Sequence, residues 1–157
     1  MAPDQTRSPH PEPLGFVIAS VGHAASSSFD AALAPAGLSP RHFAVLRGLQ
    51  AGEAQSQQDL AHALGIPASR IVGLLDELVA RGYVFRRESA SDRRVKVVAI
   101  LDAGRTALTE LTALAARSEQ LLVRGLSAQD KKELRRLLGV IYDNVATELD
   151  GVRARLW

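Results

Sequence analysis

The sequence predicts a mainly α-helical protein with one small β-hairpin. Apolar side chains recur at helical spacing through most of the 157 residues, and glycines and prolines interrupt them at intervals that suit short helices. A single stretch, residues 83–101, instead has two alternating or β-branched runs around a polar loop, as a hairpin does. A hydrophobic content of 46% suffices for one domain with a core, or for two small lobes packed closely together.

The amino-terminal part is expected to form an arm followed by two helices. Residues 1–13 hold four prolines and almost no apolar side chain, so we expect a disordered arm. Apolar and small residues then predict a first helix over residues 14–33, ended by the segment APAGLSP. Within that segment Ser39 and Pro40 have the form of an N-cap and a first helical residue, so a second helix is expected from there until Gly52.

A helix-turn-helix is expected next. Ser56 and Asp59 form a variant of the capping box, and the segment SQQDLAHALGI predicts a short third helix that Gly65 ends. Over residues 68–82 the apolar side chains recur at the spacing of an amphipathic fourth helix, with Ile71, Leu74, Leu75, Leu78 and Val79 on the buried face. Two helices joined by a tight glycine-containing turn, the second with small polar residues at its start, match the helix-turn-helix pattern.

The predicted hairpin carries a local concentration of positive charge. Residues 83–87 and 94–101 are the expected strands, and a hairpin directly after a helix-turn-helix is a wing. Between positions 81 and 96 there are six basic residues and two acids, whereas the net charge of the whole chain is only +2. The basic residues are Arg81, Arg86, Arg87, Arg93, Arg94 and Lys96. Such a concentration is typical of a surface that binds a polyanion.

Two further helices are expected after the wing. The first covers residues 102–124, and the second begins at Ser127, where Asp130 completes a cap. The last helix carries an apolar stripe of Leu134, Leu137, Leu138, Ile141, Val145 and Leu149. The stripe is more simply explained as a core or a dimer seam than as a cofactor site. On a terminal helix of so small a chain it favours a partner.

Several function classes lack the residues they need. The chain has no cysteine, which excludes disulfides, thiolate metal sites and thiol-based redox sensing. The histidines have no short ligand spacing, and motifs of hydrolases, zinc proteases and phosphate-binding loops are missing, so we expect no metal, no cofactor and no enzyme. The longest apolar run, residues 14–21, is too short for a membrane helix, and Asp4 and Glu12 make the leading segment unlike a signal peptide. We therefore expect a cytoplasmic protein without membrane contact.

One ordered set of residues runs through the helix-turn-helix, the wing and the start of the next helix: Leu60-Ala61, Leu78, Arg81-Gly82-Tyr83-Val84, Asp92-Arg93-Arg94, and Leu101 with Gly104. With this set, residues 14–157 resemble the MarR family of bacterial winged helix-turn-helix transcriptional regulators. The resemblance implies a homodimer in which the terminal helices, residues 14–37 and 102–157, interlock with those of the partner. Residues 38–101 would then form the DNA-binding lobe, each lobe reading half of a near-palindromic site with its wing along the minor groove.

The resemblance further implies a ligand-responsive repressor. Family members commonly sense small aromatic or phenolic anions in a cleft between the dimerisation helices and the winged lobe. Here His23, His42 and Arg47 are the polar residues placed to meet such an anion. The fourth helix departs from the family, which often has a hydroxyl residue near its second position and a basic one at its middle, where this chain has Arg70 and Glu77. The operator sequence therefore cannot be taken over from relatives.

The candidate contacts to double-stranded DNA come from three places. The fourth helix offers small or hydrogen-bonding residues that suit the major groove, namely Ala68, Ser69, Arg70, Val72 and Gly73. The start of the third helix adds Ser56 and Gln57, and the wing adds Arg86, Arg93, Arg94 and Lys96. The charge of Asp92 disfavours DNA, so its expected role is to structure the wing by accepting bonds from loop amides or by pairing with a neighbouring arginine.

Each of these assignments has an alternative. Arg70 either reads a guanine with its planar fork or grips a phosphate. The wing cations either enter the minor groove, where narrow A·T tracts concentrate negative potential, or only keep an edge strand solvated. For the whole chain, the competing hypotheses are a winged-helix module that binds protein instead of DNA, and a DNA binder that ignores ligands.

Overall fold

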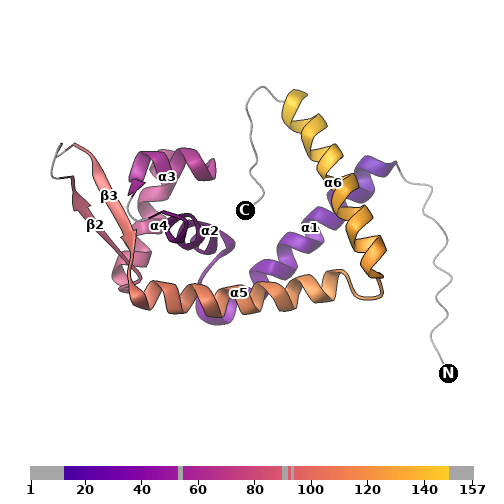
Figure 1. Cartoon of the computed structure of the whole chain (residues 1–157), viewed down its shortest axis with the longest axis horizontal. Helices are drawn as coiled ribbons and strands as arrows, with labels where there is room; N and C mark the ends of the chain where they lie inside the picture. Colours follow the sequence, from indigo (N-terminus) through magenta and orange to yellow (C-terminus); the bar gives the residue numbers. More distant parts are fainter. Residues whose placement is uncertain (1–12, 53–54, 90–91, 93, 149–157) are drawn as a thin grey trace.

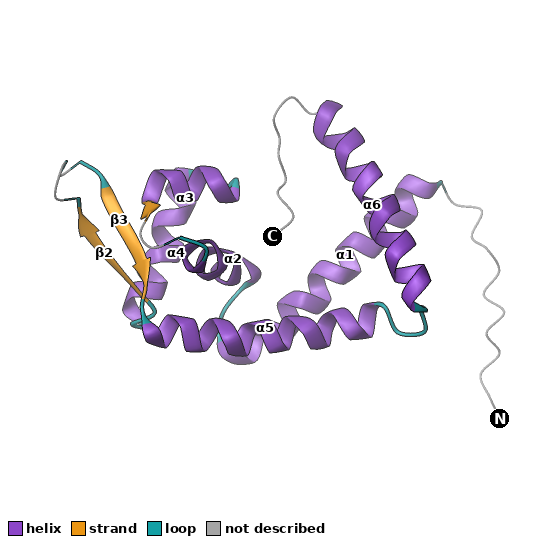
Figure 2. Cartoon of the chain, in the orientation of Figure 1, coloured by secondary structure: helices purple, strands orange, loops and turns teal. Residues whose placement is uncertain are grey.

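The computed structural model describes residues 13–52, 55–89, 92 and 94–148. Its helices are α1 (Leu14–Leu33), α2 (Pro40–Gln50), α3 (Gln57–Leu64), α4 (Ala68–Ala80), α5 (Asp102–Leu122) and α6 (Ala128–Glu148), with a 3-10 turn at Ala34–Ala36. The strands are β1 (Gln55–Ser56), β2 (Val84–Glu88) and β3 (Lys96–Ile100). A lobe of α2, α3, α4 and the strands lies at one end of the molecule, and α5 runs from it toward α6 (Figures 1 and 2). The mainly helical fold with a small wing is confirmed, whereas residues 1–12 of the predicted arm lie outside the described residues.

Local capping signals set the helix starts where the sequence predicts them. The Ser56 hydroxyl accepts the backbone N–H of Asp59 at 3.0 Å and donates to the Asp59 carboxylate at 2.6 Å. The same exchange opens α6, where the Ser127 hydroxyl accepts the N–H of Asp130 at 3.2 Å. Because these bonds span only three residues, their pattern can be recognised in the sequence alone.

The wing is the larger part of a three-stranded antiparallel sheet in the order β1-β3-β2. Strands β2 and β3 pair from Val84 opposite Ile100 to Glu88 opposite Lys96. Strand β1 pairs with the other edge of β3 and places Gln55 opposite Val98. The sequence predicts only the hairpin and misses β1, because a two-residue strand is too short to show alternation. Its pairing attaches the start of α3 to the wing.

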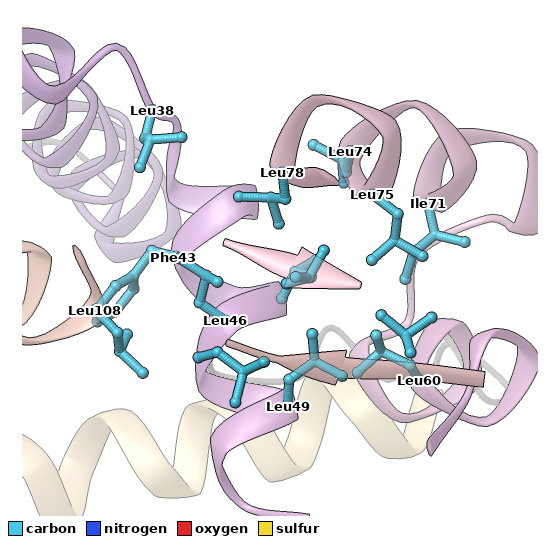
Figure 3. Close-up of a cluster of buried hydrophobic side chains, with 14 of the residues drawn as sticks. Leu38, Phe43, Leu46, Leu49, Leu60, Ile71, Leu74, Leu75, Leu78 and Leu108 are labelled. Carbon is cyan, nitrogen blue, oxygen red and sulfur yellow. The ribbon is translucent and has the colours of Figure 1, made fainter. Parts of the chain in front are cut away.

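The lobe encloses one hydrophobic core, to which α2, α3, α4, the strands and α5 all contribute (Figure 3). Its largest fully buried side chains include Leu46, Leu49, Leu60, Ile71, Leu75 and Leu78. Burial of each such side chain stabilises the fold by about 1.5–3 kcal/mol. The prediction for α4 is wrong at Val79, which is 39% exposed. At about 3.6 residues per turn this side chain points roughly 90° away from the centre of the buried stripe.

Helix α5 joins the wing to α1. The N–H of Leu101 donates to the carbonyl of Tyr83 at 2.9 Å, and a Cβ at Gly104 would lie 2.2 Å from the same oxygen. Only glycine therefore lets α5 start so close to the hairpin. Farther along α5 the buried hydroxyl of Ser118 lies 3.0 Å from that of Ser28 on α1.

The terminal helices leave many large apolar side chains exposed in the single chain. They are Leu14, Phe16 and Val21 on α1, Leu121, Leu122 and Leu126 at and after the end of α5, and Leu134, Leu137, Leu138, Val140 and Val145 on α6. The stripe predicted on the last helix is thus not part of the chain's own core, and Leu149 lies outside the described residues. Exposed apolar surface on this scale marks an interaction site.

Candidate nucleic-acid interface

The turn between α3 and α4 allows the two helices to cross within a few residues. Gly65 ends α3 with a φ of +63°, a left-handed conformation that glycine adopts without steric cost. The N–H of Ile66 then donates to the carbonyl of Ala61 at 3.0 Å, and Pro67 is the N-cap of α4. We call α4 the recognition helix, after its place in the helix-turn-helix.

The front of the recognition helix is open. Ala68, Ser69, Arg70, Val72 and Gly73 are all exposed, whereas the apolar residues on the back of the helix are buried. No atom lies within 4 Å of the place that a Cβ on Gly73 would occupy. The backbone of this helix can therefore approach the edges of bases in a major groove closely.

Asp92 orders the tip of the wing. Its Oδ1 accepts the backbone N–H of Arg94 at 2.9 Å, and its carbonyl accepts the N–H of Val95 at 3.0 Å. The N–H of Ser89 donates across the loop to the carbonyl of Val95 at 2.9 Å. These bonds leave the Arg94 side chain exposed at the end of the hairpin. Its neighbour Arg93 lies outside the described residues.

Two cations predicted to contact DNA have acidic partners within the chain, which the sequence pattern does not reveal. Arg86 on β2 pairs with Asp76 of the recognition helix. Its second terminal nitrogen donates to Oε1 of Gln57 on α3 at 3.4 Å. Lys96 pairs with Glu88 on the opposite strand at 2.9 Å. In the single chain both cations are therefore partly neutralised by an acid, and their contact with DNA stays a prediction.

Other cations remain available to a polyanion. Arg70 and Arg94 are exposed, and neither forms an ion pair with another described residue. The guanidinium of Arg87 lies 5.8 Å from the centre of the Phe85 ring. Ser56, predicted to contact DNA, is half-buried and its hydroxyl caps α3.

The three residues predicted for an effector cleft are not brought together. His23 is exposed on α1, and Arg47 is exposed near the end of α2 with its guanidinium 5.7 Å from the centre of the Phe43 ring. His42 is buried at the start of α2. None of the three lines any of the three hollows described below.

His42 connects the start of α2 to the recognition helix. Its Nδ1 accepts the backbone N–H of Ser39 at 3.1 Å and lies 2.9 Å from the Ser39 hydroxyl. Its Nε2 lies 3.1 Å from Oε2 of Glu77 without the alignment of a hydrogen bond, and the two groups form an ion pair only when the ring is protonated. Burial lowers the pKa of His42 below the usual 6.5, Glu77 opposes this shift, and Arg81 adds to it.

Arg41, which the sequence does not single out, lies between two hollows. One, of about 140 Å³, has Arg41 and Arg70 on its rim beside the turn of the helix-turn-helix. The other, of about 210 Å³, lies between α1 and α2, where Asp30 and Ser39 also line it. In the sequence, only the position of Arg41 directly after the predicted start of α2 could have suggested a role for it. A third hollow, of about 290 Å³, lies between α5 and α6.

No helix in the described part of the chain has the length and hydrophobicity needed to cross a membrane. Likewise, no three potential ligand side chains among the described residues come together as a metal site would require.

Comparison with known proteins finds both a family and solved structures that resemble this chain. A family model described as the MarR family matches residues 36–95. A MarR family transcriptional regulator from Rhodococcus sp. RHA1 is 30% identical with a TM-score of 0.71, the match covering 82% of this chain and 91% of the other.

The transcriptional repressor CouR is similar to this chain in two solved states. Bound to a 23-mer DNA duplex, it is 32% identical with a TM-score of 0.74, and the match covers 82% of this chain and 92% of CouR. CouR from Rhodococcus jostii RHA1 bound to p-coumaroyl-CoA is 31% identical with a TM-score of 0.68, over 83% of this chain and 92% of the other. The similarity to these proteins therefore extends beyond the lobe to the other helices of this chain.

Proposed function

The chain belongs to the MarR family of winged helix transcription regulators, and we propose that it is a repressor that binds double-stranded DNA as a homodimer and responds to a small aromatic or phenolic anion. The proposal rests chiefly on one observation, the exposed front of α4 beside a wing whose tip Asp92 orders. Both surfaces belong to the lobe at one end of the molecule (Figure 1).

In the proposed complex the recognition helix enters the major groove and the wing lies along the minor groove. The small residues Ala68, Ser69 and Gly73 let the helix backbone come close to the bases. Arg70, which is exposed, is proposed to bond guanine O6 and N7 together, a contact worth about 1–3 kcal/mol of discrimination between bases. Arg94 at the wing tip reaches a phosphate or a narrow minor groove, where negative potential is concentrated. The structure of CouR bound to a 23-mer DNA duplex supports the binding of double-stranded DNA by this chain.

The exposed apolar side chains of α1, α5 and α6 support a symmetric dimer. A second copy of the chain would cover these side chains on both subunits at once, since a twofold interface uses the same surface of each partner. The two recognition helices then read half-sites about 34 Å apart, one turn of DNA. A near-palindromic operator follows from this symmetry.

An effector site is proposed where α1 meets α2. CouR bound to p-coumaroyl-CoA supports a ligand-responsive regulator. In this chain Arg41 lines the hollow of about 210 Å³ between the two helices together with Asp30, and a guanidinium can hold a carboxylate or a phenolate. Arg41 thus joins His23, His42 and Arg47 as a candidate for binding the anion. An effector bound here weakens DNA binding only if it favours a geometry in which the two recognition helices are no longer one turn of DNA apart.

Selection of random duplexes on the purified protein tests the proposal. We expect a near-palindromic sequence to be enriched, and its binding to weaken steeply with salt because several phosphates are contacted. Aromatic and phenolic anions are then screened for release of the selected duplex. A winged-helix module for proteins would enrich no sequence, and a ligand-insensitive regulator would enrich one that no compound releases.

A further inference from the structure

We propose that Arg81 and Glu77 fasten the recognition helix to the linker between α1 and α2, so that the linker sets the direction in which this helix meets DNA. The linker consists of residues 34–39 and is gripped at two places, which we call the Arg81 contact and the His42 contact. The inference rests on the proposed function and assigns to these side chains a positioning role, not a contact with DNA.

The Arg81 contact holds the first half of the linker. Arg81 is the C-cap of α4, and its terminal nitrogens donate to the carbonyls of Gly37 at 2.7 Å and of Ala36 at 3.3 Å. A planar guanidinium fork matches two adjacent acceptors, which a lysine ammonium does not. Gly37 has a φ of +63°, and a Cβ there would lie 3.1 Å from the Arg81 guanidinium. The linker is therefore shaped to receive this side chain.

The His42 contact holds the second half. His42 occupies the third position of α2, where a capping box usually has glutamate or glutamine. Because Nδ1 accepts the N–H of Ser39, the neutral ring carries its proton on Nε2, which faces the Glu77 carboxylate at 3.1 Å. A glutamate at this position could cap α2 equally well but would repel Glu77. The imidazole caps α2 and attracts the recognition helix at once.

Buried side chains on both sides make the linker a rigid connection. Leu33, the last residue of α1, and Leu38 are both buried in the core of the lobe. A rotation of α1 relative to the lobe would therefore displace residues 34–39, and the two contacts would transmit this displacement to α4. In a dimer held by its terminal helices, these contacts help to fix the distance between the two recognition helices.

The test compares selective with unselective DNA binding by full-length variants. His42→Asn keeps an acceptor near Nδ1 but cannot reach Glu77, and Arg81→Lys keeps the charge but loses the fork. We expect each to weaken binding to the selected operator roughly tenfold, about the effect of one mismatched base pair. Binding to random duplex and the salt slope should stay at the wild-type values, because no phosphate contact is lost. His42→Gln, which can reach Glu77, should restore most of the operator affinity.

Two controls separate positioning from general damage. Ser39→Ala weakens the cap of α2 while leaving the His42 contact with Glu77, so it should reduce thermal stability more than operator selectivity. Arg105→Lys makes the same exchange on the exposed start of α5, away from the linker, and should change neither quantity. If His42→Asn fails to fold, Arg81→Lys decides alone, since Arg81 is exposed and leaves the core intact.

The outcomes distinguish this inference from the proposed function. If the wild type shows no salt-dependent binding to duplex DNA, both the proposed function and this inference are wrong. If the wild type binds and Arg81→Lys has an unchanged ratio of operator to random affinity, the inference alone is wrong. A flatter salt slope for Arg81→Lys would also overturn it, because Arg81 would then contact DNA itself.

Discussion

Arg86 on the wing pairs with Asp76 on the recognition helix, and its second nitrogen lies within hydrogen-bond distance of Gln57 on α3. One guanidinium therefore holds the three elements of the DNA-binding lobe in a fixed relation. In the proposed complex the wing and the recognition helix therefore approach a duplex as a unit. The positive charge of Arg86 is partly neutralised by Asp76 within the protein.

Arg86→Ala and Arg94→Ala form a matched pair, because both remove one positive charge from the same hairpin. Arg94 is exposed without an acidic partner among the described residues, so its loss should lower the slope of log affinity against log salt by about one. Arg86→Ala should leave that slope near the wild-type value and cost about 0.2–1 kcal/mol of stability, as a partly exposed ion pair does. DNA titrations at several salt concentrations measure both slopes. Equal slopes would show that Arg86 also contacts phosphate.

Arg70→Ala tests base reading by the recognition helix. If the fork of Arg70 bonds a guanine, the variant should lose about 1–3 kcal/mol at one base pair of each half-site and little elsewhere. Duplex selection repeated with the variant measures the preference at every position. A uniform loss for all sequences would assign Arg70 to a phosphate.

The sign of the effect of Asp92→Ala separates two roles for this carboxylate. Removal of a negative charge near DNA would by itself tighten binding. Because Asp92 holds the Arg94 amide at 2.9 Å, we instead expect a loss of operator affinity of about 1 kcal/mol, the contribution of a typical hydrogen bond. Asp92→Asn keeps the accepting oxygen and should bind at least as tightly as the wild type. Tighter binding by Asp92→Ala would refute a structural role.

The stability of the lobe should depend on pH through His42. Burial lowers the pKa of His42 in the folded protein below its unfolded value of 6.5, so the unfolded chain binds more protons just below that pH. The stability difference between wild type and His42→Asn should be largest above pH 6.5 and shrink as the pH falls below it. Denaturant unfolding of both proteins from about pH 8 to about pH 5 measures it. A difference that grows toward acid would mean that the pair with Glu77 dominates.

Leu138→Glu tests whether the exposed stripe on α6 is the dimer seam. Leu138 is 47% exposed in the single chain, and a carboxylate there would be costly in an apolar interface. We expect this variant to be monomeric and to bind the operator weakly. Val79→Glu places the same charge at a side chain of 39% exposure on the lobe and should remain dimeric. Light scattering of both variants compares their masses, and a dimeric Leu138→Glu would exclude this seam.

The helices and their starts are predictable because their signals are local. Ser56 with Asp59 and Ser127 with Asp130 act across three residues, and the buried faces repeat with the period of a helix. Strand β1 has no such signal, since its two residues become a strand only through β3. Val79 lies at the edge of the apolar stripe of α4, where helical periodicity does not predict whether a side chain is buried.

The use made of each charge in the candidate site cannot be predicted in the same way. The sequence places Arg86 and Lys96 in one basic cluster, but only the fold brings Asp76 and Glu88 beside them. The burial of His42 between α2 and α4 likewise depends on how two helices cross. Residue type therefore indicated the kind of surface, and tertiary packing decided which cations remain free.

Sedimentation of the chain with its selected duplex at increasing salt measures both the number of chains on the DNA and the electrostatic part of binding. We expect two chains on each duplex and an affinity that falls by orders of magnitude between about 50 mM and about 200 mM salt if six or more phosphates are contacted. One chain per duplex, or a complex that salt leaves unchanged, would contradict the proposed function.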